Sequence, residues 1–169
     1  VAATMDDIAG SFRVSKSRIV GATVGEPEDR VKLRAAQATE SDARALAWGL
    51  QVASENLFST LFGRKAEDIL VAAALVPGQG MSLEYTSFAE LDGSIVGVLH
   101  GMSAEQSVVP DKVWNDAAGW RMIRAGTVML LGRRLFSALD HHEPGDWYLQ
   151  AIAVSPAARG HGVGTQLFE

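Results

Sequence analysis

Short apolar runs, separated by glycine, proline and acidic residues, divide this chain into alternating strand and helix patterns. Residues 31–36 alternate apolar and charged side chains, which predicts a first strand. Thr39 or Ser41 is placed to cap a helix, whose apolar positions recur at roughly helical spacing: Ala43, Leu46, Ala47, Leu50 and Val52. Two further helices are predicted over about 54–63 and 65–76.

A hairpin and more helices are predicted next. Residues 83–91 form its first strand, Asp92-Gly93 supplies the turn, and residues 94–101 form the returning strand. Two helices rather than one are expected over 111–139, because three glycines interrupt the helical periodicity: Gly119, Gly126 and Gly132. These helices either pack against the sheet or form a lid over a substrate.

The strongest pattern lies at the end of the chain. The apolar run 147–154 predicts a buried strand, which Ser155-Pro156 ends because proline brings no amide donor. Three glycines at alternate positions follow and lead into a helix predicted from Thr165: Gly160, Gly162 and Gly164. Glycines let a ligand approach the main chain, and the first amides of a helix favour anions. The segment therefore predicts a phosphate or pyrophosphate site, with a simple connecting loop as the alternative.

The spacing of these glycines distinguishes between phosphate-binding motifs. It matches neither the Gly-x-Gly-x-x-Gly dinucleotide fingerprint nor the Gly-Lys-Ser/Thr ending of a P-loop. The segment resembles motif A of the GNAT superfamily of acyl-CoA-dependent N-acyltransferases, Arg/Gln-x-x-Gly-x-Gly/Ala after a strand ending in Val-x-Pro. The matching residues are Val154, Pro156, Arg159, Gly162 and Gly164. The hairpin Phe-Ala-Glu-Leu-Asp-Gly-Ser-Ile-Val-Gly-Val-Leu also resembles the central hairpin of that superfamily.

The resemblance implies an α/β (α+β) fold, with a mixed, mostly antiparallel central sheet flanked by helices and a helical insertion before the motif A strand. Residues 31–169 are expected to form this domain, and residues 1–30 an N-terminal arm or short helices with a linker. Residues 4–19 also resemble a helix-turn-helix, so a DNA-binding regulator with an acyl-CoA sensor is an alternative. Because the chain starts at Val1 and stops at Glu169, barely one turn into its last helix, we expect the domain to be incomplete at its C-terminus.

The resemblance also implies a reaction, the transfer of an acetyl group from the cosubstrate acetyl-CoA to a primary amine of a small molecule or peptide. The glycine loop would hold the pyrophosphate, and the edge of the motif A strand would pair with the pantetheine amides. The cofactor-binding residues expected from it are Ile152, Ala153, Val154, Arg159, Gly160, His161, Gly162, Val163, Gly164 and Thr165.

Such a reaction needs a general base or a water chain, because the amine must be neutral to attack. Glu84 and Glu90 are the candidates, on the first strand of the hairpin and on one side of it by period two; solvated strand charges are the alternative. Gln150 cannot act as a base. Many superfamily members protonate the leaving thiolate with a tyrosine that lies beyond the end of this chain. A catalytically silent acyl-CoA-binding module is therefore a third possibility.

Composition narrows the class of protein. A length of 169 residues, with 47% hydrophobic and 21% charged residues, is typical of one globular domain. The net charge of −5 argues against a general nucleic-acid surface or a polybasic membrane patch. The absence of cysteine excludes a disulfide scaffold, a cysteine nucleophile and a thiolate metal site.

Four further expectations concern location, metal binding, partners and pockets. No apolar run reaches the roughly 18 residues of a membrane span and no signal peptide opens the chain, so we expect a cytoplasmic protein. Adjacent His141 and His142 point apart on a loop, so no metal site is expected there. Many GNAT proteins pair, which makes a homodimer one expectation. Three aromatic residues belong either to the core or to an acceptor pocket: Trp48, Phe58 and Phe62.

Overall fold

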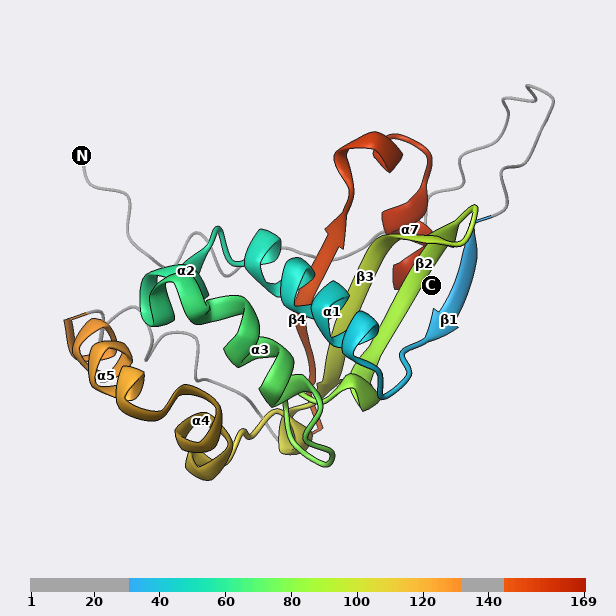
Figure 1. Cartoon of the computed structure of the whole chain (residues 1–169). Coiled ribbons are helices and arrows are strands. Elements are labelled where there is room, and N and C mark those ends of the chain that lie inside the picture. Colours follow the sequence, from blue (N-terminus) through green and yellow to red (C-terminus); the bar gives the residue numbers. More distant parts are fainter. Residues whose placement is uncertain (1–30, 132–144) are drawn as a thin grey trace, which may run out of the picture.

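The computed structural model describes residues 31–131 and 145–169 (Figure 1). Within these ranges, four strands form one antiparallel sheet in the order β1-β2-β3-β4. The strands are β1 Lys32–Ala35, β2 Thr86–Leu91, β3 Ser94–Ser103 and β4 Trp147–Val154. This arrangement confirms the expected antiparallel sheet flanked by helices.

Helices cover both faces of the sheet. They are α1 Glu40–Ala53, α2 Leu57–Phe62, α3 Ala66–Ala74, α4 Asp111–Ala118, α5 Met122–Leu131 and α7 Val163–Phe168. Figure 1 shows α1 crossing one face of the sheet with α3 beside it, and α4 and α5 lying farther from the sheet. The expected helix-turn-helix segment, 4–19, and the histidines His141 and His142 lie outside the described residues.

Helix α1 begins as its sequence predicts. The Thr39 side chain caps it by accepting a hydrogen bond from the Asp42 amide at 3.2 Å, and Glu40 and Asp42 lie in its first turn, where the helix dipole favours negative charge. Its apolar face is buried, except that Val52 is 41% exposed and does not belong to the core. The helical period alone did not separate Val52 from the residues that face the sheet.

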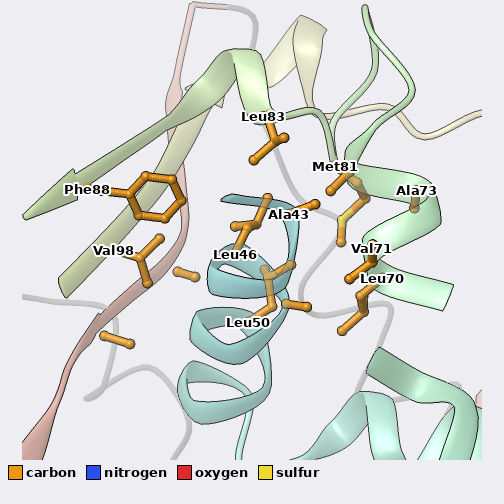
Figure 2. Packing of buried hydrophobic residues seen from close by; sticks show 14 of the residues in the cluster. Ala43, Leu46, Leu50, Leu70, Val71, Ala73, Met81, Leu83, Phe88 and Val98 are labelled. Atoms are coloured by element: carbon orange, nitrogen blue, oxygen red, sulfur yellow. The ribbon is translucent and has the colours of Figure 1, made fainter. Parts of the chain in front are cut away.

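The main core lies between α1, α3 and one face of the sheet (Figure 2). Phe88 of β2 and Val98 of β3 point toward α1, and Leu70 comes from α3. Their neighbours along the strands, Ala89 and Leu99, point to the opposite face and pack against α7. The sheet thus carries a core on each face, and the second one holds α7 in place.

The hairpin has the predicted turn but a shorter first strand. Asp92 and Gly93 both take positive φ angles, 51° and 76°, as a two-residue type I′ turn requires. Strand β2 starts at Thr86, because residues 83–85 form a 3₁₀ turn that the Ser82 hydroxyl caps by accepting from the Glu84 amide. The prediction that Glu84 lies on this strand is therefore wrong, and period two does not relate Glu84 to Glu90.

Strand β4 carries one extra residue relative to β3. Ala151 pairs with His100 and Leu149 with Gly101, so Gln150 has no residue opposite it. Such a bulge bends the strand and increases its twist. Because β4 is at one end of the described sheet, the bulge shapes an edge that no described strand covers.

The helical stretch before β4 breaks at one of the glycines that were expected to interrupt it. Gly119 takes a φ of 55° and ends α4, and α5 follows it, so the part of this stretch that the structure describes, 111–131, holds two helices as predicted. Gly126 instead lies inside α5 with open space around it, and does not interrupt the helix. Gly132 is outside the described residues.

Candidate functional site

The glycine-rich segment after β4 builds a hollow in the surface. Strand β4 ends at Val154, a short 3₁₀ turn follows over 156–158, and α7 begins at Val163. Between them lies a cavity of about 330 Å³. Its lining comprises Val154, Ala158, Arg159, Gly160, Gly162, Val163, Gly164 and Thr165. The structure thus gathers most of the expected cofactor-binding residues at one place and adds Ala158 to them.

Two of these glycines hold the loop in a conformation that other residues adopt only with strain. Gly160 and Gly162 have φ angles of 82° and 75°, in the left-handed region. A Cβ atom built on either would meet no heavy atom within 4 Å, so both face open space. The main chain is therefore exposed to any ligand that enters the hollow.

Gly164 has a different role in the same loop. Its φ is not positive, and a Cβ built on it would lie 3.7 Å from Val154 Cγ2, in ordinary van der Waals contact. Since both residues line the cavity, a side chain at position 164 would occupy the hollow itself. Glycine at this position keeps the cavity open.

Arg159 and His161 tie the loop to itself. Arg159 Nε donates a hydrogen bond to the Val154 carbonyl at 3.1 Å, across the turn. His161 Nδ1 lies 3.0 Å from the Arg159 carbonyl, which can only accept, so Nδ1 carries the proton in the neutral ring. His161 is exposed and does not line the cavity, although it was expected among the cofactor-binding residues.

The remaining expected residues lie on β4. Ala153 is buried and packs into the core with α1, whereas Ile152 is on the opposite face and partly exposed. Neither side chain lines the cavity. The main chain of both residues belongs to the uncovered edge strand β4, which can pair with amide groups as an added strand would.

The two candidate general bases are not brought to this site. Glu90 Oε1 accepts a hydrogen bond from Arg34 Nε at 2.6 Å, and Glu84, exposed in the turn before β2, accepts from the Gly78 amide at 2.8 Å. Strand β3 lies between β2 and β4, so about 10 Å separates the main chains of β2 and β4. Glu90 on β2 is thus two strands away from the outer edge of β4, and neither Glu90 nor Glu84 lines the hollow.

A buried histidine on β3 escaped the sequence analysis. His100 is fully buried; its Nε2 lies 2.9 Å from the Gly80 carbonyl and its Nδ1 2.8 Å from Thr86 Oγ1. The carbonyl can only accept, so Nε2 carries the proton and Nδ1 accepts from the threonine. Burial lowers the pKa of His100, which keeps the ring neutral. Both nitrogens are engaged, so the ring links the loop at Gly80 to the sheet. Its position within an apolar strand run was the signal for a satisfied core histidine.

Gln150, at the β4 bulge, also has a constrained side chain. Its Nε2 lies 3.3 Å from Met81 Sδ, a weak acceptor, while its Oε1 is buried and finds no hydrogen-bond partner in the described part of the chain. The amide cannot take up a proton at neutral pH, so it can orient a neighbouring group but not act as a base.

The described residues hold neither a cluster of metal ligands nor a membrane-spanning helix. No three histidine, aspartate or glutamate side chains in ranges 31–131 and 145–169 come together as metal ligands. In the same ranges, no helix is long and apolar enough to cross a membrane.

Comparison with known proteins places this geometry in a family. The model of the acetyltransferase (GNAT) family matches residues 73–169, more than half of the chain, including the hairpin, β4 and the glycine loop. No curated protein gave a match.

Two solved structures resemble the fold. One, described as the crystal structure of an acetyltransferase, has a TM-score of 0.53 and 21% identity, over 81% of this chain and 70% of that chain. The other, an N-acetyltransferase from Staphylococcus aureus Mu50, has a TM-score of 0.63 and 17% identity, over 81% of this chain and 72% of that chain. At these identities the likeness concerns the fold. The match of the family model over residues 73–169 carries the assignment: the chain belongs to the acetyltransferase (GNAT) family, a family of acyltransferases.

Proposed function

We propose that this protein is an N-acetyltransferase, which moves an acetyl group from acetyl-CoA to a primary amine of a small molecule or peptide. The observation that carries the proposal is the 330 Å³ hollow at the end of β4, where glycine keeps both the main chain and the cavity accessible. An open, amide-lined loop of this kind suits a phosphate-bearing ligand better than a simple connection between a strand and a helix.

The proposed donor site uses the main chain of residues 160–165 for the pyrophosphate of acetyl-CoA. The guanidinium of Arg159, whose Nε already bonds to the end of β4, has further N–H groups that can add a charge-assisted contact to phosphate. The outer edge of β4 would pair with the pantetheine amides through the main chain around Ile152 and Ala153.

In the proposed reaction, the amine nitrogen forms a bond to the acetyl carbon while the bond from that carbon to sulfur breaks, giving an amide and the thiol of CoA. An amide of β4 near the thioester carbonyl would stabilise the negative charge that develops on oxygen. The amine proton must pass to a base. Glu84 and Glu90 remain the proposed bases, and because neither lies on β4 or lines the hollow, we propose that they act through water.

The first test is the free energy of unfolding with and without acetyl-CoA. Ligand at about a hundred times its dissociation constant should stabilise the native chain by about 2.7 kcal/mol. Gly164→Leu should abolish this gain, because its side chain fills the hollow without requiring a strained φ. Gly162 is a poorer site for the variant, since its φ of 75° strains any other residue.

Gly126→Leu is the matched control, a glycine replaced in a helix where the side chain meets open space. It should keep the full stabilisation by acetyl-CoA. An unchanged gain in Gly164→Leu would place the ligand elsewhere. If acetyl-CoA binds but no amine in a panel of primary amines yields free CoA thiol, the silent acyl-CoA-binding module becomes the better description.

A further inference from the structure

Helix α5 has an apolar outward face, although this face lies at the surface of the molecule. Ile123 is 75% exposed and Leu130 is 70% exposed. The opposite face of the helix packs inward, where Ala125 is buried with Leu61 of α2 and Ile69 of α3. Figure 1 shows α5 at the edge of the molecule, far from α7 and the glycine loop. A surface helix normally turns polar residues outward, so α5 departs from the usual pattern.

The outward residues of α5 share one face. Ile123, Thr127 and Leu130 are separated by four and three positions, which aligns them along the helix, with Gly126 beside them. The Thr127 hydroxyl donates a hydrogen bond to the Ile123 carbonyl at 2.9 Å, so it is satisfied within the helix. Among the described residues of α5, none on this face is charged. The face therefore offers apolar contact and little else.

Other helices of the protein carry charges on their outward sides. Helices α1 and α4 each have an exposed ion pair between residues four positions apart, Arg44 with Glu40 and Lys112 with Asp116. The charged residue of α5 is Arg124, and its Nε donates to a main-chain carbonyl of α2 at 3.1 Å. This arginine is thus tied to its own chain beside the apolar face. Large exposed apolar patches of this kind are typical of interaction sites.

A glycine lies in the middle of the apolar face. A Cβ atom built on Gly126 would meet no heavy atom within 4 Å. Ile123 lies three positions before this glycine and Leu130 four positions after it, so larger side chains flank a low point on both sides along the helix. Small residues at such low points let the backbone of a second helix approach closely.

This arrangement is complementary to itself. A two-fold interface brings the same surface of two chains together. If two α5 helices cross antiparallel at Gly126, Ile123 of each copy lies beside Leu130 of the other. Parallel pairing would instead place each of these residues beside its own equivalent. The near-equal spacing of the two side chains about the glycine suits the antiparallel arrangement.

The charges near the face favour the same arrangement. Arg121 directly precedes α5 and Arg124 lies in its first turn, whereas residues 128–131 are uncharged. Antiparallel pairing places the arginines of one copy beside the uncharged half of the other, and parallel pairing would oppose like charges. A membrane is a poorer match, because the chain has a net charge of −5 and the cytoplasmic surface of membranes is negative.

The size of the face indicates a weak pair. Stable interfaces bury about 800 Å² and roughly 20–30 residues on each partner. Besides the four residues on the face, Trp120 and Leu131 at the two ends of α5 are 73% and 84% exposed. This is a smaller set than a stable interface needs, so we expect a dissociation constant on the order of 10–100 µM.

We propose that the outward face of α5 is a self-association surface, at which two copies of this chain pair antiparallel with Gly126 at the crossing point. Removal of the Ile123 and Leu130 side chains from water drives the association. The sequence suggested a homodimer without naming a surface, and this proposal names one. It does not rest on the proposed acetyltransferase activity, because no residue of α5 lines the hollow beside α7.

The experiment is sedimentation equilibrium of the full chain without acetyl-CoA, over concentrations of about 1–500 µM that bracket the expected dissociation constant. The mean mass should rise from that of the monomer toward that of the dimer. Ile123→Glu should raise the dissociation constant at least about tenfold, because a charge enters an apolar contact. Val108→Glu is the matched control: Val108 is an apolar residue outside α5, 66% exposed, and this substitution should change the constant less than about twofold.

A mixing experiment tests the antiparallel arrangement. Leu130→Lys should weaken association as Ile123→Glu does. An equimolar mixture of the two variants should associate at least about fivefold more tightly than either alone, because one contact becomes a Glu–Lys pair and the other stays native. Gly126→Leu should also weaken association, since its side chain holds the two helices apart, whereas unspecific apolar adhesion would be strengthened by it.

Several results would overturn the proposal. They are a native chain that stays monomeric at every concentration, equal weakening by Val108→Glu and Ile123→Glu, stronger association of Gly126→Leu, and no gain on mixing. A monomeric native chain that binds phosphatidylserine vesicles, and loses this binding in Ile123→Glu, would assign the face to a membrane instead. Thermal unfolding reports whether each variant keeps its fold. Failure of acetyl-CoA to stabilise the chain would count against the acetyltransferase proposal alone.

Discussion

Arg34 and Asp42 form a two-point ion pair that fastens β1 to the first turn of α1. Arg34 Nη1 donates to Asp42 Oδ2 at 2.6 Å and Nη2 donates to Oδ1 at 2.8 Å, while the same Oδ2 accepts from the Gln37 amide at 2.7 Å. The guanidinium also lies over the ring of Phe88, 5.1 Å from its centroid, and bonds to Glu90 through Nε. One arginine thus joins β1, β2 and α1 above the main core.

Asp42→Asn should destabilise the protein by about 2 kcal/mol, because a buried Arg34 partner loses its charge and one of two parallel bonds. Arg34 holds the pKa of Asp42 below its usual value near 3.9. A carboxyl with a depressed folded pKa contributes stability that is complete above the unfolded pKa and is lost as pH falls through the folded pKa. Chemical denaturation at pH 7 and at pH 3 should therefore show the difference between native and variant shrinking in acid.

Asp68→Asn is the control for this prediction. Asp68 pairs with Lys65 at 2.7 Å, but both side chains are more than half exposed, and exposed pairs contribute little. Its unfolding curve should nearly overlay that of the native protein at both pH values. Equal effects at positions 42 and 68 would contradict a special role for the Arg34–Asp42 pair.

Gly49 permits the close approach of α1 to β3. A Cβ atom on this glycine would lie 2.1 Å from Val98 Cγ1, far inside contact distance. Gly49→Ala should therefore cost about 1–3 kcal/mol, even though alanine is the better helix former. Gly126→Ala, in open space on α5, should instead stabilise by up to about 1 kcal/mol. Urea denaturation measures both.

A second substitution tests the cause assigned to Gly49. Val98→Ala removes the methyl groups that clash, so in the Gly49→Ala background it should cost much less than it does alone. Strictly additive effects of the two substitutions would mean that the clash is not what makes Gly49→Ala costly.

Local signals predicted much of this fold. Thr39 and the acidic residues after it predicted the start of α1. Asp92-Gly93 predicted the hairpin turn, and the apolar run before Ser155-Pro156 predicted β4. Each of these features depends on contacts between residues that are close in the sequence, so the local pattern of residue types is enough to predict it. The family motif then added the order of the elements, which local propensity does not contain.

The features that the sequence did not reveal depend on contacts between distant residues. The bulge at Gln150 exists only through the pairing of β3 with β4, and the start of β2 at Thr86 depends on the 3₁₀ turn at Ser82. The engagement of Glu90 by Arg34 spans 56 positions of the chain. Candidate catalytic carboxylates were therefore harder to assign than the glycine loop, whose residues are neighbours in the sequence.

Glu84 and Glu90, the two proposed general bases, can be told apart because only Glu90 is expected to contribute to the stability of the fold. Glu84→Gln keeps an oxygen that can accept from the Gly78 amide, so it should leave the melting temperature unchanged. If Glu84 takes the amine proton through water, kcat should fall about 100-fold. Glu90→Gln removes the charge that pairs with Arg34 in a part-buried place, so it should lower the melting temperature as well. Steady-state kinetics with a primary amine, beside thermal unfolding, gives both quantities; unchanged kcat in both variants would remove both residues from the mechanism.

His100 should make the protein less stable in mild acid. Its buried ring donates to Gly80 and accepts from Thr86, and burial lowers the pKa of His100 below the value near 6.5 of an unfolded chain. As pH falls through 6.5 the unfolded chain takes up a proton that the folded chain cannot, so the free energy of unfolding decreases from there toward the folded pKa.

His100→Gln should be less stable at pH 7, because the ring's two hydrogen bonds are not both replaced, but should lose less stability between pH 7 and pH 5.5. His161→Gln removes an exposed histidine and should keep the native pH dependence. Urea denaturation at a series of pH values measures all three proteins, and parallel curves for native and His100→Gln would show that this ring does not set the acid sensitivity.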